Sequence, residues 1–206
     1  YYSFSGSAIL NVVVEQISYA WNYADNNDIV FFLFNVKNSN TYQLTNCRIG
    51  PCVDADIGNE AGTMANDRTA FDYTRNLAMQ FQSTPEPGWP RTGVVGFRFF
   101  QGPVNNTGAT VDIIDDQYPH SIAPGQPLGL TAFTIFTIDL DPKNDEERYQ
   151  ALEGMNWETG ILDAYDQWGT VLPGDKRFVM ATGPFILGPD SVVTLCVGTM
   201  AAWDTS

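Results

Sequence analysis

Short runs of β-branched and aromatic residues, separated by turn residues, dominate this chain. In several of them apolar and polar residues alternate, which is the period of a strand with one buried face. The run at residues 29–37 is almost continuously apolar, so we expect that strand to be buried on both faces. The pattern predicts strands at residues 9–18, 29–37, 43–54, 73–82, 92–101, 129–139, 175–181 and 191–200.

The segments between these runs are less regular. Residues 73–82 are compatible with a strand or a short helix, and apolar residues at alternate positions near their end favour the strand. Residues 54–72 and 105–125 are polar and lack a period, which predicts long loops. A single helix is expected at residues 144–154, because its first turn is acidic and Gly154 is a natural stop.

One helix among about eight strands excludes a repeated strand–helix–strand fold. We therefore predict an all-β protein, an antiparallel β-sandwich (jelly-roll-like) with long loops and one short helix. Residues 1–206 suffice for one such domain, and 44% hydrophobic residues supply its core. The chain begins without Met or a signal sequence, which favours a part of a longer or processed exported protein.

Charge narrows the possible partners. The chain carries 24 Asp and Glu against 10 Lys and Arg, a net charge of -14, so its surface repels nucleic acid. No apolar stretch is long enough for insertion into a membrane. The three cysteines, Cys47, Cys52 and Cys196, allow one disulfide and one thiol, and the alternative for Cys47 and Cys52 is that they are ordinary core residues.

The densest cluster of possible ligands lies in the polar segment after residue 53. Asp54 and Asp56 leave a strand on one face, and further oxygen donors follow, as suits a hard cation such as Ca²⁺. The spacing is not that of an EF-hand, because Gly58 stands where a third ligand would be. Ordinary loop composition is the alternative, but Arg68 is the only basic residue there to balance the carboxylates. The predicted Ca²⁺ ligands are Asp54, Asp56, Asn59, Asn66, Asp67 and Asp72.

Groups for catalysis are sparse. His120 is the only histidine and sits in a loop-like sequence. No zinc-binding or phosphate-binding motif is present in the sequence. We therefore predict that the protein is not an enzyme. A glycosidase needs two paired carboxylates, and the 24 acidic residues of this chain offer too many pairs for the sequence to select one. The main candidates are Asp112, Asp115, Asp116, Asp139, Asp141 and Glu158. Asn105 begins an N-x-T sequon, which would be exposed if it were glycosylated.

Aromatic residues in loop-like segments offer a different function, the stacking of sugar rings. Aromatic residues that cap the ends of a sandwich core would look the same in the sequence, and that interpretation is favoured for most of them. The candidates are Trp21, Tyr23, Trp89, Trp157, Tyr165 and Trp168.

Several short segments stand out in order along most of the chain: residues 18–21, 44–46, 53–58, 66–67, 72–77, 95–97, 148–149, 154, 175–180 and 182–185. Together they resemble a β-rich domain of large secreted bacterial proteins. Those proteins carry type IX secretion sorting or FlgD-like immunoglobulin domains at their C-termini. The resemblance implies export, a β-rich fold and an extracellular setting, but no activity.

Our first hypothesis is therefore a non-catalytic structural or adhesive module, extracellular or on the cell surface, and stabilised by Ca²⁺. Residues 1–14 are apolar enough to add a strand to another copy of the chain, which would allow a surface layer or filament. An ordinary edge strand of the same domain is the alternative for that segment. The second hypothesis is a glycan-binding module of a secreted enzyme, and a glycosidase is the third.

Overall fold

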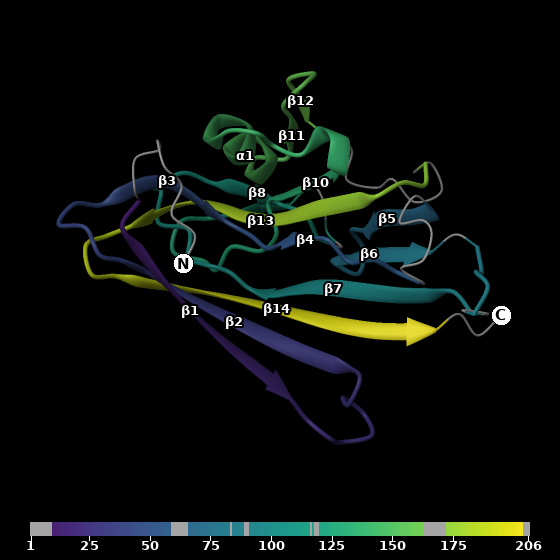
Figure 1. Cartoon of the computed structure of the whole chain (residues 1–206). Helices are drawn as coiled ribbons and strands as arrows, with labels where there is room; N and C mark the ends of the chain where they lie inside the picture. Colours follow the sequence, from purple (N-terminus) through teal and green to yellow (C-terminus); the bar gives the residue numbers. More distant parts are fainter. Residues whose placement is uncertain are drawn as a thin grey trace.

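The computed structural model describes residues 10–58, 66–82, 84–88, 91–115, 117, 120–162 and 172–203. They form an antiparallel β-sandwich with one short α-helix, as the sequence predicts, and every strand pair in these ranges is antiparallel. Figure 1 shows the two sheets as layers, with the helix on the far side of the smaller one. No helix in the described part of the chain is long and apolar enough to cross a membrane.

The larger sheet has six strands. Their burial alternates most clearly in the fifth strand of the order, Leu77–Gln82, whose inward residues are nearly inaccessible. In spatial order the strands are β1 (Val12–Ala20), β2 (Ile29–Asn38), β14 (Val192–Trp203), β7 (Gly93–Gln101), β6 (Leu77–Gln82) and β5 (Asp67–Asp72).

The smaller sheet is built around β13 (Lys176–Leu187), whose two halves have different partners. The first half lies between β10 (Ala132–Thr137) and β4 (Cys52–Val53), and the second half pairs with β3 (Leu44–Ile49). Two further hairpins complete the strands: β8 (Val111–Ile113) with β9 (His120–Ile122), and β11 (Met155–Asn156) with β12 (Ile161–Leu162).

Aromatic side chains fill the space between the sheets. Phe133 is buried and stacks on Phe71 of the opposite sheet, with 4.6 Å between ring centroids, and also contacts Phe178. A second apolar layer covers the outer face of the smaller sheet, where Ala151 of α1 (Asp145–Leu152) packs on β10 and β13. The 3-10 turn η2 (Ile138–Leu140) leads towards α1.

The predicted helix is confirmed. Asn144 caps its first turn by accepting a hydrogen bond from the Glu147 amide at 2.9 Å, and the first turn is acidic. Gly154 follows the helix with φ of +81°, a conformation that glycine adopts without strain.

Some strand predictions need correction. The run at 43–54 is two strands, because Gly50 and Pro51 interrupt it, and a Cβ on Gly50 would lie 1.9 Å from the Met180 carbonyl oxygen. The predicted loop 54–72 ends in β5, and the segment 105–125 contains the β8–β9 hairpin. β2 is half-buried along nearly its whole length rather than buried on both faces, since β1 and β2 extend beyond the smaller sheet.

The structure shows the state of the three cysteines and the burial of the sequon asparagine. Cys47, Cys52 and Cys196 are all free thiols, and burial raises the pKa of each. Asn105 is completely buried, and its amide nitrogen donates to the carbonyl oxygens of Ala109 and Ile122. A glycan on that nitrogen is incompatible with this packing.

Candidate metal centre

Polar side chains replace apolar ones at one end of the sandwich interior. Asp67 and Thr69 of β5 face inward, opposite Gln82 and Gln80 of β6. All four residues are at most 2% exposed, and further along the same strands the inward positions become apolar again. Buried polar groups must be paired to be tolerated, so this row requires partners from another part of the chain.

The segment that follows β4 supplies part of that pairing. The amide of Ala55 donates to Gln80 Oε1 at 3.1 Å, and the amide of Ile57 donates to Asp67 Oδ2 at 3.3 Å. Gly58 ends the contact between this segment and the buried polar row, and its φ is +114°. A Cβ at this position would lie 2.5 Å from Gln82 Nε2. The segment is therefore extended, and its alternate residues Asp54 and Asp56 share one face.

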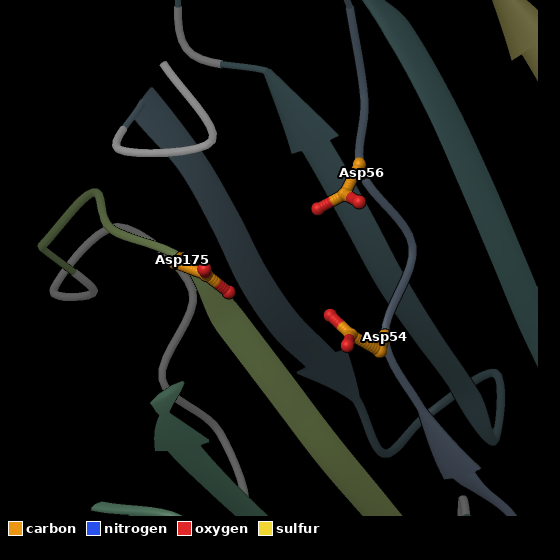
Figure 2. A group of neighbouring side chains, drawn as sticks. All are labelled: Asp54, Asp56 and Asp175. Atoms are coloured by element: carbon orange, nitrogen blue, oxygen red, sulfur yellow. The ribbon is translucent and has the colours of Figure 1, made fainter. Parts of the chain in front are cut away.

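The start of β13 reaches the same place from far along the sequence. The amide of Gly174 donates to the Asp67 carbonyl at 2.9 Å, and Gln80 Nε2 donates to the Lys176 carbonyl at 2.7 Å. These two bonds hold Asp175 beside the extended segment. Figure 2 shows the carboxyl groups of Asp54, Asp56 and Asp175 turned towards a common space.

The three carboxylates are close enough to share one ion. One oxygen of each lies within 4.8 Å of the others. Two oxygens bound to one Ca²⁺ at 2.3–2.6 Å are at most about 5 Å apart, so the spacing fits this ion. Asp54 and Asp56 are exposed and Asp175 is half-buried, which leaves room for water as further ligands. An all-oxygen set without histidine or cysteine favours a hard cation over zinc.

One basic residue belongs to the cluster. Arg177 Nε donates to Asp54 at 2.7 Å, and its Nη1 donates to Asp141 at 2.9 Å. Burial of Arg177 lowers its pKa, but the two carboxylates outweigh that effect and the net shift is upward. The sequence argument that Arg68 alone could balance these carboxylates is thus incomplete, because Arg177 arrives from β13. The carboxylate of Asp175 has no hydrogen-bond or ion-pair partner within the described ranges, although the backbone carbonyl of this residue accepts from the Ile138 amide.

Asp67 lies directly behind the three carboxylates. Burial, together with the nearby charges of Asp56, Asp175 and Glu86, raises its pKa to about 7 against the lowering effect of the Ile57 hydrogen bond. Its Oδ1 atom and both amide atoms of Gln82 have no hydrogen-bond partner among the residues described. Unpaired buried groups cost about 1–3 kcal/mol each, so this end of the interior suits a bound cation with its water.

The structure thus joins some predicted ligands and separates others. Asp54 and Asp56 come together, with Asp67 behind them, and Asn66 donates to Glu86 at 2.8 Å. Asp72 sits at the opposite end of β5, about 17 Å along an extended strand of six residues. Burial raises its pKa, but hydrogen bonds from Thr74 and Arg75 in the β5–β6 turn outweigh that and lower it. Asn59 lies outside the described residues.

Other predicted candidates are dispersed. His120 Nδ1 lies at hydrogen-bond distance, 2.9 Å, from a carboxylate oxygen of Asp115, while Ser121 donates to Asp112, so the two pairs do not form a relay. Trp157 meets the Phe136 ring edge-on and is partly buried against the apolar layer that Ala151 of α1 helps to form. Trp21 and Tyr23 are exposed. Asp116, Trp89, Tyr165 and Trp168 lie outside the described residues.

Comparison of the chain with protein-family models and with curated proteins finds no match. The function is therefore argued from the geometry alone.

Proposed function

We propose that this protein is a non-catalytic structural module of an extracellular or cell-surface assembly, stabilised by Ca²⁺ held by Asp54, Asp56 and Asp175. The observation that carries the proposal is the convergence of these three carboxylates over the buried Asp67. They come from two segments more than a hundred residues apart in sequence, so one ion would tie β13 to the segment after β4. Such an ion acts as a cross-link between distant parts of the chain.

An extracellular setting suits this chemistry. Calcium sites of extracellular modules bind at about 10⁻⁴–10⁻³ M, which a few carboxylates with water ligands can provide. Two features support a structural role over a catalytic one. The only histidine is engaged with Asp115, and the three carboxylates lie within 4.8 Å of one another, which is close enough to share one ion.

Thermal unfolding tests the proposal. In about 5 mM Ca²⁺ the melting temperature should rise above its value in EDTA, because the ion binds only the folded state. Asp56→Asn and Asp175→Asn should each abolish most of that rise. Asp190→Asn is the matched control, since Asp190 is an exposed carboxylate that pairs only with Lys37 on the surface. An unchanged melting temperature in Ca²⁺ contradicts the proposal.

A second candidate, glycan binding, is favoured by a ladder of aromatic rings on the outer face of the larger sheet. Tyr19 stacks on Trp21, Trp21 meets Phe31 edge-on, and Phe31 contacts Phe100, with centroids 5.2–5.9 Å apart. Gly198 makes this contact possible, because a Cβ on it would lie 2.5 Å from the Phe100 ring.

Tyr19, Trp21 and Phe100 are each more than 40% exposed, so their ring faces are accessible to a sugar. Glycan-array binding that is lost in Trp21→Ala but kept in Tyr42→Ala would support this candidate. Tyr42 is more exposed than Trp21, at 59% against 41%, but stands outside the ladder. If the unmodified protein binds no glycan on the array, glycan binding is ruled out as the function.

A further inference from the structure

The sandwich is open on the side where β1 and β3 are the outermost strands of their sheets. An apolar groove of about 480 Å³ lies between them, and α1 forms part of its rim through Tyr149 and Leu152. It exists because the larger sheet continues through β2 and β1 beyond the edge of the smaller sheet (Figure 1). Its apolar walls include Val12, Val14, Phe34 and Val36 on one side and Leu44 and Ile49 on the other.

The groove has the form of a missing strand position. β3 has β13 as its only strand partner among the described residues, so its other edge faces the groove. Val14 is 57% exposed although it faces inward beside Val36. A strand placed beside β3 would cover these apolar side chains and extend the smaller sheet by one strand.

The amino-terminal sequence has the pattern that such a strand needs. Residues 12–14 belong to β1, an edge strand of the same domain, which leaves residues 1–9 outside the described structure. In that stretch Tyr2, Phe4 and Ala8 alternate with Ser3, Ser5 and Ser7. This period of two gives an extended chain one apolar face. Nine residues span about 30 Å and the six of β3 about 20 Å, so the length is sufficient.

We propose that the groove accepts residues 1–9 of a second copy of this chain as an added strand beside β3. The apolar face of the segment contacts the groove, and its serines face away. Donor and acceptor are different surfaces of one chain, so each copy can donate to the next and the contact repeats into an open, head-to-tail assembly. This inference concerns an interface that shares no ligand with the proposed calcium site.

The strand in the groove is expected to come from a second copy rather than from the same chain, because the connection between residues 1–9 and β1 is short and fixed. Leu10 reaches the groove and Asn11, with φ of 50°, alone separates it from β1. The Leu10 carbonyl accepts from Asn40 Nδ2, and Asn11 bonds Ser39 through its carbonyl and its amide side chain. Sheets pack about 10 Å apart, and a short rigid hinge that must cross this distance favours exchange between copies.

Sedimentation velocity with complementary variants tests the inference at roughly 1–100 µM protein. The donor-defective variant Tyr2→Ser/Phe4→Ser and the acceptor-defective variant Val14→Asp should each remain monomeric, whereas the unmodified chain forms concentration-dependent oligomers. Mixing the two variants should give dimers and nothing larger, because only one productive contact remains. Ser3→Thr/Ser5→Thr changes the opposite face and should assemble like the unmodified chain.

Three results would overturn the inference. The first is an unmodified chain that stays monomeric over the whole range. The second is oligomers that persist in the donor-defective variant. The third is a monomer whose own residues 1–9 fill the groove. An apolar dye would then bind the groove of the donor-defective variant but not that of the unmodified chain. Circular dichroism and the melting temperature must show that each variant is folded, and Val14 is exposed enough for its substitution to be tolerated.

Discussion

Asp67 and Gln82 lie opposite each other at the end of the β5–β6 pair, and both side chains are almost inaccessible to solvent. A carboxylate and an amide at inward positions are unusual in a sandwich core, where apolar side chains are the rule. The carboxylate faces the segment that carries Asp54 and Asp56, through the Ile57 amide. This pair therefore marks the point where the interior changes from a packed core to a polar site.

The first prediction concerns pH. Because burial raises the pKa of Asp67 to about 7 from 3.8, its neutral form stabilises the folded state most at low pH. That contribution is complete below about pH 4 and is lost as the pH rises to 7. Relative to Asp67→Asn, the unmodified protein in EDTA should lose up to roughly 1.4 kcal/mol of unfolding free energy per pH unit. Urea unfolding at several pH values measures this difference. The prediction would be contradicted if the unfolding free energies of the unmodified protein and of Asp67→Asn changed with pH in parallel.

The second prediction concerns Arg177. Its side chain is mostly buried and bridges Asp54 and Asp141, so Arg177→Gln should lower the unfolding free energy by about 1–3 kcal/mol. The same change should increase calcium affinity, because it removes a positive charge that competes for Asp54. Arg75→Gln serves as the control, since Arg75 is largely exposed and pairs with Asp72 away from the site. Urea unfolding and calcium titration calorimetry measure the two effects, and weaker calcium binding by Arg177→Gln would contradict the prediction.

The third prediction concerns the core between the sheets. Phe133→Ala removes a ring that contacts both Phe71 and Phe178, and should cost about 3–5 kcal/mol of unfolding free energy. Tyr42→Ala, at an exposed turn, should change it by less than about 0.5 kcal/mol. Chemical denaturation compares the two, and equal effects would mean that the sheets are not packed as described.

The fold was largely predictable because local patterns and tertiary contacts agree. Strands such as β7 and β14 show apolar residues where the core requires them, and the helix carries its own start and stop signals in Asn144 and Gly154. β5 was missed for a physical reason. Its inward positions include Asp67 and Thr69, so the strand has no apolar period to detect.

The candidate site was only partly predictable. Asp54 and Asp56 were found because alternate residues of an extended chain share a face. Asp175 was not among the predicted ligands, since only the pairing of β13 brings it to that place. Asp72 was included because it is near in sequence, but an extended strand carries it to the far end of β5.

The central claim is that one cation joins Asp54, Asp56 and Asp175. A crystal structure grown with Ca²⁺ and measured for anomalous scattering tests it most directly. The account predicts a single peak between the three carboxylates, with calcium–oxygen distances of about 2.3–2.6 Å. Solvated carboxylates that point apart, with no peak between them, would contradict it.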